Sequence, residues 1–235
     1  MTFDEIIANL PEPYYRDNQA DIVIYHSDCR LILPLIPAQS IDLVLTDPPY
    51  NVGIDYGPSV NDKLPKKEYL KTIQEFLAMT RDLSGDKLVL ILGSKLILDW
   101  WQHIPEAKLI IVKMGAISNN KIKGLTLQYR PILTTVPSNT YMSDLWEDIR
   151  WPGEGYYFNE ERYGHPAMTP EKLARRLVSI FTEALGQVVL DPYCGCGTMA
   201  VASKVLNRHF IGIEIEEKYC EIAAKRLSQS VMRLV

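Results

Sequence analysis

The chain has no run of apolar residues long enough to cross a membrane. No stretch approaches the roughly 18 consecutive apolar residues that a membrane-spanning helix needs. Residues 1–18 contain Asp4, Glu5 and Glu12 in place of the basic and apolar regions of a signal peptide. The lack of a long apolar run excludes a helical membrane protein. Together with the lack of a signal-peptide pattern, it predicts a cytoplasmic location.

The sequence also has few cysteines, and none of them forms a Cys-x-x-Cys pair. The four cysteines are Cys29, Cys194, Cys196 and Cys220. The single residue between Cys194 and Cys196 is too short a spacing for the usual zinc knuckle. We therefore predict no metal site.

An excess of positive charge is likewise missing. The net charge is −4 and the pI is about 5.6, which argues against a protein that coats nucleic acid. Residues 107–143 are a local exception, because they contain no Asp or Glu. The basic residues there are Lys108, Lys113, Lys121, Lys123 and Arg130. The sequence leaves two interpretations of this segment open, contact with phosphates or an ordinary solvated face.

Short apolar runs alternate with helical patterns along the chain. Strands are predicted at residues 22–25, 41–46, 87–92, 109–112, 188–190 and 210–213, and helices at 66–82, 170–185, 198–206 and 216–228. The pattern of residues 128–136 predicts a further strand or hairpin arm, and the composition of residues 137–164 predicts a loop. This alternation is typical of an α/β fold with a mostly parallel, doubly wound sheet. A chain of 235 residues with 47% hydrophobic content predicts one domain, residues 1–235.

The segment from Asp191 to Thr198 has the pattern of a ligand-binding loop. Gly195 and Gly197 allow the backbone to turn tightly at the end of a strand, and a helix is predicted to begin at Thr198. The next predicted strand ends in Glu214, where doubly wound folds hold ribose hydroxyls. The third glycine of the dinucleotide fingerprint is missing, so the pattern favours a nucleoside cofactor other than NAD.

A second loop, Asp47-Pro48-Pro49-Tyr50, follows the strand predicted at residues 41–46. The two prolines stiffen the backbone and remove two N–H donors, which leaves a carboxylate, free carbonyls and an aromatic ring. Such a loop suits a planar group that carries an amine, because oxygens accept its N–H groups while the ring of Tyr50 stacks on it. Asn51, Asp55 and Tyr56 either shape this pocket or close a turn.

These loops resemble the motifs of a known family, the S-adenosylmethionine-dependent DNA methyltransferases that modify exocyclic amino groups. Asp47-Pro48-Pro49-Tyr50 matches the family's catalytic motif. The loop from Asp191 to Thr198 is similar to its cofactor loop, and Glu214 to its ribose-binding acid. The order, with the catalytic motif first, resembles the circularly permuted beta group. The resemblance implies a catalytic half at residues 22–136 and a cofactor-binding half at residues 165–235.

Two further segments are similar to the same group. His26-Ser27-Asp28-Cys29 resembles the family segment whose Asp reaches the cofactor adenine. The segment 165–170 resembles a His-Pro-Thr-Gln-Lys-Pro segment beside the cofactor methionine, although Thr169 stands where the family usually has Lys. The resemblance assigns cofactor binding to Asp28, Cys29, Asp47, His165, Asp191, Pro192, Tyr193, Cys194, Gly195, Gly197, Thr198, Glu214 and Ile215.

The reaction that this family carries out requires the target base to leave the helical stack. The resemblance implies that Asp47 and the Pro48 carbonyl hold the amine while Tyr50 stacks on the base. An Asp at the first place of the motif favours N6 of adenine. N4 of cytosine and an RNA amine remain as alternatives.

The family usually carries a sizeable target-recognition segment, and here only residues 137–164 are available for it. Lys113, Lys121, Lys123 and Arg130 are our candidates for DNA contacts. The aromatic residues of the segment either contact DNA or cover the edge of the core; they are Trp146, Trp151, Tyr156, Tyr157 and Phe158. A homodimer or a separate specificity partner would also supply recognition.

Overall fold

The structure is a computed structural model. It describes residues 1–113, 121–122, 125–126, 129–137, 143–149 and 163–229. The helices are α1 (Phe3–Ile7), α2 (Cys29–Ile32), the 3-10 helix η1 (Leu33–Leu35), α3 (Lys66–Ser84), α4 (Ile97–Trp101), α5 (Glu171–Phe181), α6 (Thr198–Val205) and α7 (Glu217–Gln229). The strands are β1 (Tyr15–Asp17), β2 (Ile22–His26), β3 (Leu43–Thr46), β4 (Leu88–Ile91), β5 (Lys108–Lys113), β6 (Lys121–Ile122), β7 (Leu125–Thr126), β8 (Tyr129–Thr134), β9 (Leu145–Trp146), β10 (Val188–Asp191) and β11 (His209–Glu214).

Nine strands of the described residues form one mixed sheet in the order β1-β2-β11-β10-β3-β4-β8-β5-β9. The central strands from β2 to β4 are all parallel, and β8 runs antiparallel between β4 and β5. Strands β6 and β7 form a separate hairpin. The predicted mostly parallel α/β sheet is therefore confirmed, and residues 128–136 supply an antiparallel strand, β8.

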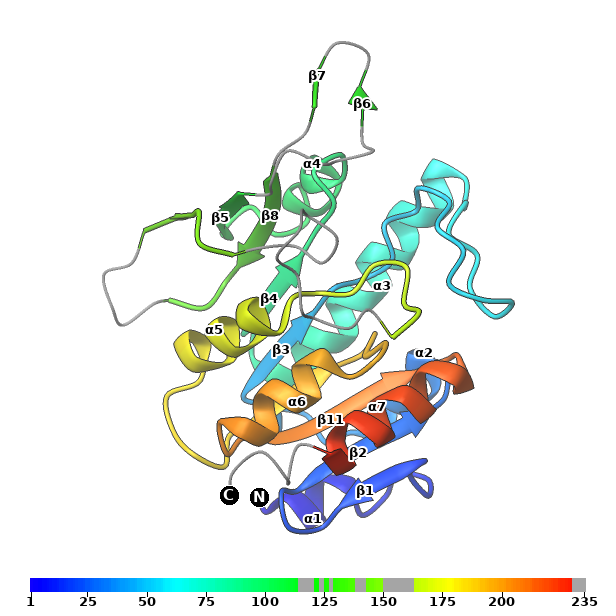
Figure 1. The fold of residues 1–235 in the computed structure, drawn as a ribbon, viewed down its shortest axis with the longest axis vertical. Coiled ribbons are helices and arrows are strands. Elements are labelled where there is room, and N and C mark those ends of the chain that lie inside the picture. Colours follow the sequence, from blue (N-terminus) through cyan, green and yellow to red (C-terminus); the bar gives the residue numbers. More distant parts are fainter. Residues whose placement is uncertain (114–120, 123–124, 127–128, 138–142, 150–162, 230–235) are drawn as a thin grey trace.

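Helices cover both faces of the sheet (Figure 1). One apolar cluster joins α1, α2, α3 and α4 to one face, and a second joins α5, α6 and α7 to the other. Residues along β2 alternate between the clusters, since Val23 lies in the first and Ile24 in the second. This three-layer arrangement is the doubly wound fold predicted from the alternation of strands and helices. No helix among the described residues is long and apolar enough to span a membrane.

The structure adds short elements that the sequence patterns did not predict. Helices α1, α2 and α4 and strands β1 and β9 each have five residues or fewer, which is too short for a clear period. Helix α5 ends at Phe181, although the pattern predicted a helix to residue 185, because Thr182 adopts an extended backbone conformation. Strand β9 lies inside the segment predicted as loop, most of which falls outside the described residues.

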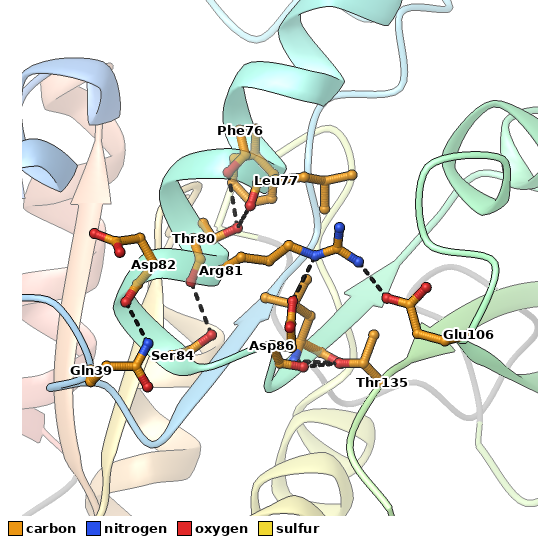
Figure 2. A network of polar contacts seen from close by, with 11 residues as sticks. Gln39, Phe76, Leu77, Thr80, Arg81, Asp82, Ser84, Asp86, Glu106 and Thr135 are labelled. Carbon is orange, nitrogen blue, oxygen red and sulfur yellow. Dashed lines mark hydrogen bonds and ion pairs between the residues drawn. The ribbon is translucent and has the colours of Figure 1, made fainter.

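A polar network ties α3 to the amino end of β4 (Figure 2). Arg81 forms ion pairs with Asp86, just before β4, and with Glu106, just before β5. The Thr135 hydroxyl donates to the carbonyl of Asp86 and so fixes the end of β8 beside the same turn. These contacts lie at the amino end of β4, whereas Gly93 follows its carboxyl end. They therefore stabilise the sheet and not the predicted site, whose segments follow the carboxyl ends of the strands.

Gly212 in the middle of β11 is required by close packing. A Cβ at this position would lie 2.7 Å from Sγ of Cys194 and 2.8 Å from Cδ1 of Ile24. We expect Gly212→Val to lower the free energy of unfolding by at least about 1 kcal/mol, because an overpacked core forces neighbours to shift. Urea unfolding of this variant and of Gly212→Ala measures the effect. Equal stability of Gly212→Val and the wild type would contradict this packing.

Candidate functional site

The predicted site segments meet at one edge of the sheet, where four neighbouring parallel strands end. Asp47 follows β3, Asp191 ends β10, Glu214 ends β11 and Asp28 follows β2. These strands are adjacent in the order β2-β11-β10-β3. The carboxyl ends of parallel strands are where doubly wound folds bind ligands. The strand order therefore brings together residues that lie far apart in the chain.

A cavity of about 390 Å³ opens at this edge. The predicted residues that line it are Asp28, Cys29, Asp47, Pro48, Pro49, His165, Asp191, Pro192, Tyr193, Cys194, Gly195, Thr198, Glu214 and Ile215. Tyr50 and Gly197 are the two predicted catalytic or cofactor residues that the described lining does not include. Helix α3 forms a further wall with Tyr69, Thr72 and Phe76.

The loop between β10 and α6 turns as the glycines predict. Gly195 and Gly197 have φ angles of +51° and +76°, in the region that favours glycine. The carboxylate of Glu214 accepts hydrogen bonds from the backbone N–H of Gly195 at 2.7 Å and of Glu216 at 2.8 Å. Glu214 thus fastens the loop to the end of β11, and each of its oxygens keeps a further lone pair for a ligand.

Asp191 lies buried at the base of the cavity. Its Oδ1 accepts hydrogen bonds from the Thr46 hydroxyl at 2.6 Å and from the backbone N–H of Tyr193 at 3.1 Å. The pKa of Asp191 is raised to about 7, chiefly by burial and also by the charges of Asp47 and Glu214, against the effect of those hydrogen bonds. The carboxyl group is therefore poised to ionise when a positive charge comes close.

The cavity as a whole is acidic. Asp47, Asp191 and Glu214 line it together, and burial raises the pKa of all three. Arg30 carries the one permanent positive charge in the described lining, and it is paired with Asp28 at 2.5 Å. A ligand with its own positive charge would relieve this crowding of carboxyl groups. The sulfonium and ammonium groups of S-adenosylmethionine meet that requirement, so the residues present fit the cofactor that the sequence predicts.

We expect the ligand-free protein to lose stability as the pH rises towards 7. The pKa of Asp191 is higher in the folded protein than in the unfolded chain, so its contribution is full below about pH 4 and is lost as the pH passes about 7. Thermal unfolding between pH 5 and pH 8 should show this decline in the wild type and a smaller one in Asp191→Asn. Asp47 and Glu214 act in the same direction and leave a residual slope. Identical slopes for the two proteins would contradict the assignment to Asp191.

The Asp47 carboxylate is held on both oxygens. The Tyr50 hydroxyl donates to Oδ1, and the Thr169 hydroxyl donates to Oδ2 at 2.8 Å. The guanidinium carbon of Arg130 lies 4.9 Å from the centre of the Tyr50 ring. Burial raises the pKa of Asp47, whereas the charge of Arg130 and the two hydroxyl donors lower it.

The position of Tyr50 differs from the one that the sequence suggested. We expected its ring to be available for stacking on a base, but the side chain is only 5% exposed and packs beneath Arg130. The reason is local, since the hydroxyl turns back to Asp47 three residues earlier. Tyr56, in contrast, lines the cavity.

His165 packs against the loop between β10 and α6. The centre of its ring lies 4.5 Å from that of Tyr219, and a Cβ on Gly195 would be 3.0 Å from its Nε2. The backbone N–H of Ala167 donates to its Nδ1 at 3.2 Å. Burial lowers the pKa of His165 to about 4, so the imidazole is neutral at neutral pH. Thr169, four residues on, is a site residue that the sequence pattern marked only as a departure from the family's Lys.

The loop after Tyr50 is organised by a carboxylate that the sequence patterns did not single out. Asp62 is buried and accepts hydrogen bonds from four successive backbone N–H groups, those of residues 51–54. The Asn51 side chain pairs with the backbone of Leu64, and the Asp55 carboxylate accepts from Gly57. Of the alternatives left open by the sequence, Asp55 thus closes a turn, Tyr56 lines the cavity, and Asn51 does both.

The same loop contacts the segment that follows β11. The backbone N–H of Ser59 donates to the Glu216 carboxylate at 2.7 Å, two residues after Glu214. A Cβ on Gly57 would lie 2.3 Å from the same carboxylate, so glycine allows this approach. The loop after β3 and the segment after β11 are thereby joined.

The candidates for DNA contacts have different surroundings. Lys113 is exposed and pairs with Glu147 at 2.6 Å, whereas Arg130 lies at the catalytic motif instead of on an open basic face. The side chain of Lys121 and the whole of Lys123 lie outside the described residues. Trp146 is buried in the core beside Arg176, as expected of a residue that covers the core edge. Trp151, Tyr156, Tyr157 and Phe158 also lie outside the described residues.

Comparison with known proteins agrees with this arrangement. The sequence profile of a DNA methylase family, N6_N4_Mtase, matches residues 99–225. The type II methyltransferase M.HpaI of Haemophilus parainfluenzae is 30% identical over 220 residues, which cover 80% of this chain and 68% of that protein.

Two solved structures share the fold. The PvuII DNA methyltransferase, described as cytosine-N4-specific, has a TM-score of 0.72 at 18% identity and covers 92% of this chain and 89% of its own. The complex of M1.HpyAVI with SAM has a TM-score of 0.61 at 23% identity and covers 87% of this chain and 99% of its own. At these identities the likeness establishes the fold alone.

Proposed function

Because the chain belongs to the N6/N4 family of DNA methylases, we propose that it transfers a methyl group from S-adenosylmethionine to the exocyclic N6 of adenine in DNA. One observation carries the proposal. Asp47 of the catalytic motif and Asp191 and Glu214 of the cofactor segments line a single acidic cavity. A methyl donor and an amine acceptor would meet there.

The cofactor would be held mainly by the ends of β2, β10 and β11. Glu214 offers its remaining lone pairs to the ribose hydroxyls, and Asp28, which caps α2, offers a carboxylate at the end of β2. Gly195 and Gly197 let the cofactor approach the backbone closely. The chemistry that the bound cofactor supplies is an electrophilic methyl group.

Asp47 orients the acceptor amine. Its carboxylate and the Pro48 carbonyl accept the two amine hydrogens and so direct the nitrogen lone pair towards the methyl group. Positive charge develops on that nitrogen during transfer, and the buried carboxylate stabilises it. Asp47 then takes up the proton that the methylated amine releases. The base is read after it has left the stack, and Tyr56 is an aromatic side chain of the cavity lining that could contact it.

The choice of adenine rests on the residue type at the first place of the motif. An Asp there favours adenine in the family that the sequence resembles, whereas the chemistry of Asp47 serves either amine. The fold neighbour PvuII is cytosine-N4-specific, so N4 of cytosine is the alternative. We also propose that residues 1–235 form one methyltransferase domain. This domain contacts DNA through residues such as Lys113.

Transfer of labelled methyl groups from S-adenosylmethionine to unmethylated genomic DNA tests this function. An RNA substrate serves as the control, and mass spectrometry of the product nucleosides identifies the base. N6-methyladenine in DNA is the expected product. If the product were N4-methylcytosine, the target base would be cytosine and the mechanism would stand. Label in RNA alone would overturn the assignment to DNA.

A further inference from the structure

We propose that Thr169 is a positioning residue that holds the Asp47 carboxylate in the orientation needed for transfer. The proposal rests on the proposed function and adds a residue to its catalytic machinery. Thr169 comes from the cofactor half of the chain, 122 positions after Asp47. Its contact therefore links the two halves at the reacting group.

The contact is a part-buried hydrogen bond from a hydroxyl to a carboxylate oxygen. The Oγ1 of Thr169 donates to Oδ2 of Asp47 at 2.8 Å, and the Thr169 residue is only 6% exposed. Pro170 caps α5 directly after it, so the backbone at this point is stiff. The start of α5 therefore restricts the backbone that carries the Thr169 hydroxyl.

The second oxygen of Asp47 is held from its own loop. The Tyr50 hydroxyl donates to Oδ1, so each carboxylate oxygen is held by one hydroxyl donor. A carboxylate has about four acceptor positions, and one remains on each oxygen for the amine of the base. Two hydroxyl donors therefore orient Asp47 without excluding its substrate.

The charged and titratable groups around Asp47 come from several elements. Arg130 of β8 favours the ionised carboxylate. The charge of Asp47 in turn raises the pKa of Asp191, at the end of β10, and of Tyr56, in the loop after β3. Burial raises the pKa of Asp47 as well, so each donor that stabilises the anion counts. Loss of the Thr169 hydroxyl would raise that pKa further.

The variant Thr169→Val removes the hydroxyl and keeps the shape of the side chain. We expect kcat for DNA methylation to fall about tenfold, because a hydrogen bond to a charged group is lost, with little change in KM for S-adenosylmethionine. The acid limb of the pH–rate profile should move to higher pH, since Asp47 must be ionised. Thr169→Ser keeps the donor and should restore both values.

A matched control is available in α3. Thr80 is fully buried and donates its hydroxyl to the carbonyl of Phe76 at 2.9 Å, one helical turn beyond the last α3 residue named in the cavity wall (Figure 2). Thr80→Val removes the same group from another buried threonine. It should leave kcat and the pH profile unchanged. An equal loss of kcat in both variants would assign the effect to stability and overturn the proposal.

A second readout does not depend on activity. In protein labelled with ¹³C at the Asp carboxyls, the Asp47 signal is identified by its absence in Asp47→Asn. It should titrate about one pH unit higher in Thr169→Val than in the wild type. An unchanged titration together with an unchanged kcat would overturn the role of Thr169. If wild-type protein transferred no methyl group to DNA, the proposed function would fail, while the titration would still decide whether Thr169 holds Asp47.

Discussion

Asp47→Ala is expected to lower kcat for methyl transfer about 100- to 1000-fold or more, the usual cost of removing a preorganised group from the transition state. The variant loses the acceptor for the amine hydrogens and the charge that stabilises the developing cation. Affinity for S-adenosylmethionine should remain largely intact, because the proposed cofactor contacts come mainly from β2, β10 and β11. Isothermal titration of the cofactor and single-turnover methylation measure the two quantities separately.

A change of charge alone is controlled by Asp82→Asn. Asp82 is exposed in α3, and its described hydrogen bonds are made by its backbone carbonyl (Figure 2). This variant should methylate DNA at the wild-type rate. Loss of cofactor binding in Asp47→Ala would contradict the division of labour between the two halves of the sheet.

The edge that carries the site could be predicted from local patterns. Asp47, Asp191 and Glu214 each follow or end a short apolar run, and parallel strands place their carboxyl ends together. The positive φ angles of Gly195 and Gly197 were likewise expected from a tight loop before a helix. Hydrophobic periodicity and turn-forming residues are local signals that span a few residues. They are sufficient to predict these strand ends and this glycine loop.

The contacts around Asp47 could not be predicted in the same way. Thr169 reaches it from the segment before α5 and Arg130 from β8, and no local pattern encodes which distant side chain a carboxylate meets. Tyr50 was assigned a stacking role from its motif, yet its hydroxyl turns to Asp47 and its ring packs beneath Arg130. Contacts between side chains that are far apart in the chain depend on the order of the strands in the folded sheet. That order is a property of the whole fold and not of a local pattern.

Glu214→Ala is expected to raise the dissociation constant for S-adenosylmethionine about 10- to 100-fold. The carboxylate is the proposed acceptor for the ribose hydroxyls, and it also accepts the N–H groups of Gly195 and Glu216. Its loss would leave those two buried donors without an acceptor and loosen the loop that surrounds the cofactor. Isothermal titration measures the affinity, and thermal unfolding without cofactor reports the structural part.

The two variants should show opposite effects if the cavity is divided as proposed. At saturating cofactor, Glu214→Ala should regain most of the wild-type kcat, because Asp47 and its donors Tyr50 and Thr169 belong to other elements. Asp47→Ala should keep the cofactor and lose the rate. Glu214→Gln keeps one acceptor oxygen but turns an amide N–H towards the second backbone donor, so its affinity should lie between those of Glu214→Ala and the wild type. An unchanged affinity in Glu214→Ala would remove Glu214 from the cofactor site, and a lost kcat at saturation would mean that the loop also positions the amine.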